Sequence, residues 1–111
     1  MENIILKISK DFTQTPGARY KKQGEFSGED FRDRLLIPKF KEAQNEGKKL
    51  LVDLDGCYGF LSSFIDEAFG GLTIEFGKQE VKKILSIKSN DESSLIELID
   101  TVIDEWDDKK K

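Results

Sequence analysis

The stretch Leu50-Leu51-Val52-Asp53-Leu54 decides the fold class of this chain. It is a short, almost uninterrupted apolar run that follows Gly47, a residue type common at helix ends. Strands covered on both faces read as continuous apolar runs, and such strands are typical of parallel sheets. The stretch therefore predicts a central parallel strand of an α/β protein.

Two further segments, one before and one after this strand in the sequence, also have strand character. Ile4, Leu6 and Ile8 alternate with outward-facing positions near the N-terminus, and residues 84–87 form another short apolar run. Residues 18–23 are a weaker strand candidate. Strands that alternate with helices predict an α/β sandwich, in which a small mixed, mostly parallel β-sheet is packed by about three to four α-helices.

The first long helix is predicted to begin after Ser27, which can cap its N-terminus together with Asp30. Phe26 and Phe31 stand on either side of this cap and would form a hydrophobic staple. Pro38 is expected to break or kink the helix before it ends.

The later helices follow from the same signals. Ser62 or Ser63 could cap the helix after the central strand, and Ser89 with Glu92 would form a capping box for the last one. Their apolar stripes are Ile65, Phe69, Leu72 and Phe76, then Leu95, Leu98, Ile99, Val102, Ile103 and Trp106. No internal repeat or linker is visible, so residues 1–111 are predicted to form a single domain.

Composition narrows the function classes. The 111 residues carry a net charge of −4, which is the wrong sign for a general nucleic-acid binder. No apolar run is long enough for a bilayer, and the single Cys57 fits a reducing compartment, so a cytoplasmic protein is expected. Histidine is absent, which excludes the His-dependent catalytic triads and His metal ligands. We therefore expect a non-enzymatic domain without cofactor or metal.

Asp53 and Asp55 are the first candidates for chemistry. The segment Val52-Asp53-Leu54-Asp55-Gly56 resembles the opening motif of haloacid-dehalogenase-type phosphatases, in which two strand-end carboxylates flank Mg²⁺ and phosphate. The remaining machinery of that family is missing from the residues that follow. Loop hydrogen bonds are therefore the preferred interpretation of both side chains.

Ser62 and Ser63 lie between a predicted buried strand and a helix N-terminus. Free N–H groups and the positive end of the helix dipole favour an anion there. Either serine could simply cap the helix, or it could accept a phosphate that changes a docking surface.

The chain resembles the STAS domain, the fold of sulfate-transporter tails and anti-sigma factor antagonists. More specifically it resembles a STAS-like family of unknown function from bacteria, archaea and phages. The segments that carry this resemblance are Gly17-Ala18-Arg19, residues 26–32, residues 52–56 and Gly59-Phe60-Leu61-Ser62-Ser63-Phe64-Ile65-Asp66-Glu67-Ala68-Phe69-Gly70-Gly71-Leu72.

This resemblance implies a regulatory, protein-binding role. In antagonist-type STAS domains a serine at this helix start is phosphorylated by a partner kinase of the GHKL ATPase fold, and the phosphate blocks binding. By position, Ser62 corresponds to the phospho-acceptor and Ser63 to its neighbour. Leu61 and Phe64-Ile65 depart from the antagonist pattern, which has Asp before the serines and Gly-Leu after them.

Two further groups complete the predicted site. Arg19 and Arg32 could grip a phosphate or a partner carboxylate, or Arg32 could simply pair with Glu29 while Arg19 lies on an edge strand. Phe60, Phe64 and Glu67 are predicted to face a docking partner, although phenylalanines at this spacing also suit a core.

The leading hypothesis is therefore a non-enzymatic module that binds a protein, with a GHKL-type ATPase or histidine-kinase-like protein as the partner class and Ser62 as the switch. One alternative is a STAS domain that senses a nucleotide or other anion through Arg19. Others are a Mg²⁺-dependent phosphatase-like use of Asp53 and Asp55, and an antitoxin-like or phage-encoded inhibitor. Neither nucleic acid nor a membrane is expected as a partner, and the sequence leaves the oligomeric state open.

Overall fold

A three-stranded parallel sheet organises the molecule. The computed structural model describes the backbone of residues 3–110 and the side chains of residues 3–108. Its strands are β1 (Asn3–Lys7), β2 (Lys49–Asp53) and β3 (Leu85–Lys88), in the order β1-β2-β3, and both neighbouring pairs are parallel. The α/β fold and the central position of β2 are thus confirmed. Every described strand is parallel, so the sheet has no antiparallel member.

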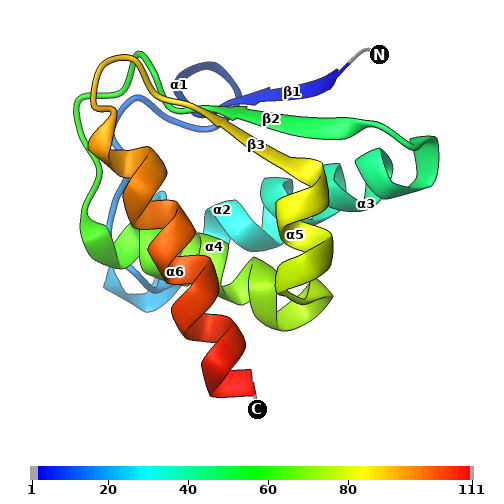
Figure 1. Ribbon diagram of the computed structural model, residues 1–111. Coiled ribbons are helices and arrows are strands. Elements are labelled where there is room, and N and C mark those ends of the chain that lie inside the picture. Colours follow the sequence, from blue (N-terminus) through cyan, green and yellow to red (C-terminus); the bar gives the residue numbers. More distant parts are fainter. Residues whose placement is uncertain (1–2, 111) are drawn as a thin grey trace.

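The helices pack against one face of this sheet. Figure 1 shows β1, β2 and β3 along the top, with α2 to α6 below them. On the helix side Leu6, Leu50 and Val52 are fully buried, whereas Ile5 on the other face is 60% exposed. On that other face of β2, Leu51 is half-buried and Asp53 is buried, so the predicted cover of the central strand is complete on the helix side and partial on the other.

The first long helical stretch runs from residue 28 to residue 46. It comprises α2 (Gly28–Phe31), the π-helical segment η2 (Arg32–Leu36) and α3 (Ile37–Glu46). Ser27 caps it, since its Oγ accepts the N–H of Asp30 at 3.0 Å, and Gly47 ends it in the left-handed conformation at φ 64°.

Pro38 does not break this stretch. The bonding pattern changes from π to α immediately before it, which places the proline in the first turn of α3. An N–H in that turn has no partner within an α-helix, so the missing N–H of Pro38 costs little. Of the predicted break or kink, the break is therefore absent, and a local π segment precedes the proline.

Residues 18–23 are not a strand. They belong to an irregular segment that ends in the short 3₁₀ turn η1 (Lys21–Gln23). Backbone hydrogen bonds tie this segment to the start of the first helix: Gly28 donates to Ala18 at 2.9 Å and Glu29 donates to Arg19 at 3.0 Å. It therefore pairs with a helix N-terminus rather than with the sheet.

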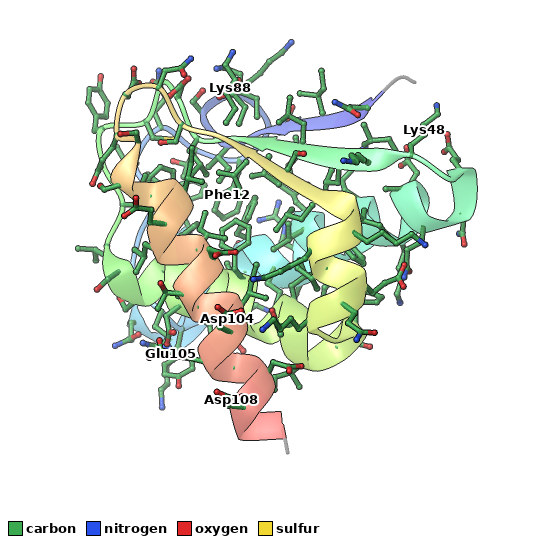
Figure 2. All side chains as sticks on the ribbon, viewed as in Figure 1. Phe12, Lys48, Lys88, Asp104, Glu105 and Asp108 are labelled. Atoms are coloured by element: carbon green, nitrogen blue, oxygen red, sulfur yellow. The ribbon has the colours of Figure 1, made fainter. Side chains whose placement is uncertain are left out.

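Phe12 lies between Phe26 and Phe31, the two residues of the predicted hydrophobic staple. Its ring centroid lies 5.4 Å from that of Phe26 and 5.4 Å from that of Phe31, so Phe12 bridges the two rings. Figure 2 shows Phe12 beneath the sheet, inside the molecule. It reaches this place because the short helix α1 (Ile8–Asp11) begins at Ile8, which was expected to continue the first strand.

The remaining helices are α4 (Ser62–Phe76), α5 (Lys78–Ile84) and α6 (Ser94–Lys110). Neither α1 nor α5 was predicted, so the described chain has more helices than the three to four expected. The capping box before α6 is also wrong: Ser89 Oγ donates to the carbonyl of Glu92 at 2.6 Å, and the helix begins later. Within residues 3–110, no helix is long and apolar enough to cross a membrane.

Candidate functional site

The candidate site is the connection between β2 and α4. It leaves the carboxyl end of the central strand and carries two strongly exposed apolar side chains, Tyr58 at 84% and Leu61 at 56%. Phe60 between them is half-buried. Ser62, the first residue of α4, follows directly and is exposed.

The start of α4 has no side-chain cap. Leu61 is the N-cap residue in an extended conformation, and its carbonyl accepts the N–H groups of Phe64 at 3.1 Å and Ile65 at 3.3 Å. Neither Ser62 nor Ser63 caps the helix, so that prediction is wrong. Both serines stand in the first turn, where the positive end of the helix dipole favours negative charge.

Phe64 and Glu67 must be removed from the predicted docking surface. The Phe64 ring is fully buried and stacks on Phe31 with centroids 5.8 Å apart. Glu67 is only 8% exposed. Both side chains lie on the face of α4 that is turned toward the first helix and the core, so a partner cannot reach them in the folded chain.

Arg19 and Arg32 converge on α4, one helical turn beyond the serines. Arg19 donates to Asp66 at 2.6 Å and to Glu67 at 3.4 Å, and Arg32 donates to Glu67 at 2.7 Å. Hydrogen bonds to Asp66 and then Glu67 raise the pKa of Arg19 despite partial burial. Burial acts to lower the pKa of Arg32, but its hydrogen bonds to carboxylates outweigh burial and raise it.

These pairs change the interpretation of the arginines. Arg32 bonds Glu67 and Asp33 rather than Glu29, and Arg19 lies in the irregular segment rather than on a strand. Because carboxylates already balance both guanidinium groups, a phosphate at this position would have to compete with them.

Trp106 joins the same network from α6. Its indole N–H donates to Asp66 at 2.7 Å, and its ring lies against α4 at Gly70. Trp106 belongs to the predicted apolar stripe of the last helix, and nothing in the sequence pointed to its polar contact.

Two glycines in the segments that carry the STAS-like resemblance, Gly28 and Gly70, are required by close packing. A Cβ at Gly70 would lie 2.2 Å from the Trp106 ring, and one at Gly28 would lie 2.5 Å from the Phe64 carbonyl. Both glycines therefore allow helices to approach α4 closely. Most of residues 59–72 are thus internal structure, and the exposed residues among them lie in the turn at residues 57–63.

Asp53 and Asp55 are engaged in hydrogen bonds at the end of β2. Asp53 accepts Lys7 Nζ at 3.2 Å and the N–H of Asp55 at 2.9 Å. Asp55 accepts the N–H groups of Asn90 at 2.7 Å and Asp91 at 2.9 Å, and these bonds lower its pKa, that from Asp91 most. Asp55 thus joins the loop after β2 to the loop after β3, while Asp53 joins the end of β2 to the end of β1.

The candidate metal ligands and the single cysteine can be located in the same way. Among residues 3–108, no group of three or more His, Cys, Asp and Glu side chains is arranged to hold a metal ion. Burial raises the pKa of the Cys57 thiol to about 11, so the reactive thiolate is scarce near neutral pH.

A small hollow lies between the 54–60 loop and the start of α6. Its volume is about 140 Å³, and Tyr58 and Phe60 line one side while Glu92 and Leu95 line the other. Pockets for small molecules usually measure about 300–1,000 Å³, so this hollow has room for a partner's side chain rather than for a nucleotide.

The parallel sheet, the helices on one face and the exposed strand-to-helix turn together define an α/β domain and are consistent with a STAS-like fold. Residues 27–95 match the family described as a STAS-like domain of unknown function (DUF4325). The chain belongs to this family. The comparisons with curated proteins and with solved structures found no match to this chain.

Proposed function

We propose that this domain is a regulatory module that binds another protein through the turn at residues 57–63. The observation that carries the proposal is a contrast within residues 58–67: Phe64 and Glu67 are buried, while Tyr58 and Leu61, which precede Ser62, are exposed. Exposed aromatic and aliphatic side chains on a turn held by a rigid sheet and helix are suited to docking.

Ser62 is proposed as the switch of this surface. A phosphate on Ser62 would add a charge of about −1.5 to −2 beside Leu61, and a partner that buries Leu61 would have to desolvate that charge. At the same time the free N–H groups of the first turn of α4 would stabilise the phosphate. Phosphorylation is therefore expected to block docking without unfolding the helix.

The proposed partner class is a GHKL-type ATPase or kinase. This proposal rests on the likeness of the chain to anti-sigma factor antagonists, whose corresponding serine is the substrate of such a kinase. The apolar start of α4, with Leu61 in place of an aspartate, would require a partner with a matching apolar recess.

The test is a binding series with the full chain. Wild-type protein and the variants Leu61→Ala, Ser62→Asp and Ser62→Ala would be used to capture partners from the host cell, followed by affinity measurements with the purified partner. Leu61→Ala and Ser62→Asp are each expected to weaken binding at least about tenfold, while Ser62→Ala retains it.

The matched control is Ile5→Ala, which removes an equally exposed aliphatic side chain from the open face of the sheet. Equal effects of Ile5→Ala and Leu61→Ala would contradict docking at the turn. Unchanged binding by Ser62→Asp would contradict the switch even if the turn is the docking surface.

A further inference from the structure

Strand β3 forms one of the two edges of the sheet, and β1 forms the other. The carbonyl of Lys88 accepts the N–H of Leu54, so the backbone groups of Lys88 face β2. Neighbouring residues of a strand direct their N–H and C=O groups to opposite sides, so those of Ile87 face away from β2. The N–H of Leu85 is already bonded to Val81 at the end of α5. The edge therefore offers the N–H and C=O of Ile87 and the C=O of Leu85.

An apolar groove runs beside this edge. In Figure 1, α6 starts near the carboxyl end of β3 and descends away from the sheet. Between the strand and this helix lies a groove of about 350 Å³. The aliphatic residues that line it are Leu85, Ile87, Ile96, Ile99 and Ile103.

The rim of the groove on α6 is acidic. Glu97 is exposed and makes no ion pair within residues 3–108, and Asp100 has a side chain that is 63% exposed. Lys82 is the basic residue of the rim, and it is shared between Asp100 at 3.0 Å and Asp104 at 2.9 Å. The rim therefore complements a positively charged occupant.

We propose that the β3 edge and this groove bind an extended segment of a partner protein, which adds to the sheet as a fourth strand. Aliphatic side chains at alternate positions of the segment would enter the groove, and flanking Lys or Arg residues would meet Glu97 and Asp100. Backbone hydrogen bonds to Ile87 would supply affinity, and the groove would select the side chains. This surface is built from β3 and α6 and includes none of residues 57–63, so it does not rest on the docking function proposed above.

A second copy of the chain suits this site less well. Pairing of two β3 edges would bring the Glu97 and Asp100 rims of both copies toward each other. Symmetric pairing about Ser86 would also need the N–H of Leu85, which Val81 already holds. A basic segment of another protein meets neither obstacle.

The experiment uses the full ¹⁵N-labelled chain and the synthetic peptide Lys-Thr-Val-Thr-Ile-Thr-Lys, whose alternate positions carry the basic and aliphatic side chains. The control peptide has glutamate at both ends. In the presence of the lysine peptide, exchange of the Ile87 amide hydrogen is expected to slow at least about tenfold, because that group becomes hydrogen-bonded. Chemical-shift changes are expected along β3 and the facing side of α6.

Two variants test the rim. Glu97→Lys is expected to weaken peptide binding about fivefold or more, whereas Glu105→Lys, which makes the same charge change lower on α6 and away from the sheet (Figure 2), leaves it unchanged. The proposal is overturned by absent binding, by shifts that map elsewhere, or by equal effects of the two variants. It is also overturned if light scattering shows a dimer that Ile96→Lys abolishes, since a second copy would then occupy the edge.

Discussion

The residue at position 70 shows how closely the helices are packed. Trp106 occupies the space that any side chain larger than glycine would need, with its ring 2.2 Å from the position of a Cβ. The same indole is held in place by its hydrogen bond to Asp66. A single glycine thus allows α6 to lie on α4, which the sequence pattern alone does not reveal.

Replacement of this residue tests the packing. In an exposed helix, Gly→Ala would stabilise the protein by about 1 kcal/mol through helix propensity. For Gly70→Ala we expect the opposite sign, a loss of about 1–3 kcal/mol, because the ring of Trp106 must move. Urea unfolding followed by the fluorescence of Trp106, the only tryptophan, measures both the loss and the displacement. An unchanged or increased stability would contradict the close approach.

At the scale of elements, the ion pairs on α4 hold the first helical stretch in place. The Arg32 and Glu67 side chains are 17% and 11% exposed, and their 2.7 Å contact joins η2 to α4. The pair lies beside the close contact of Gly28 with the Phe64 backbone. Charge pairing and steric fit therefore act on the same helix crossing.

A double-mutant cycle measures this link. Arg32→Met is expected to cost about 2–4 kcal/mol, because it leaves the carboxylate of Glu67 buried with only the longer contact to Arg19. The double variant Arg32→Met/Glu67→Met is expected to be less destabilised than the sum of the single changes by more than about 1 kcal/mol. Additive free energies of unfolding, measured with urea, would show that the two side chains act independently.

At the scale of the whole molecule, Asp55 joins the loops at the carboxyl end of the sheet. Its carboxylate accepts the N–H groups of Asn90 and Asp91, so the connection after β2 is tied to the connection after β3. This tie holds the 57–63 turn against the start of α6. The shape of the proposed docking surface therefore depends on an ionised carboxylate.

Acid is expected to weaken the fold through this group. The pKa of Asp55 is lower in the folded chain than its usual value, so its contribution to the free energy of unfolding is complete above about pH 4. The contribution disappears as the pH falls through the folded-state pKa. Wild-type protein should therefore lose more stability between pH 7 and pH 3 than Asp55→Asn does, measured by urea unfolding at both values.

The exposed Asp108→Asn provides the control for this comparison. This variant should lose as much free energy of unfolding between pH 7 and pH 3 as the wild type does. Parallel losses in wild type and Asp55→Asn would mean that other carboxylates, Asp33 among them, govern the acid limit.

The sequence by itself determined the elements whose signals are local. The apolar run at residues 50–54, the Ser27 cap and the glycine stop at residue 47 each act within a few residues, and the structure contains all three. The α/β class followed from their alternation. The STAS-like resemblance could also be recognised in the sequence, because the residues that carry it form contiguous motifs.

Only the tertiary structure decided which of those motif residues can meet a partner. Phe64 and Glu67 share a helix with the exposed Ser62, yet they are buried because the first helical stretch packs on their side of α4. The convergence of Arg19, Arg32 and Trp106 on α4 likewise joins distant parts of the chain. Arg19 and Glu67 are 48 positions apart, and Arg32 and Glu67 are 35 positions apart. Such contacts depend on how the helices pack, and no local pattern in the chain records that packing.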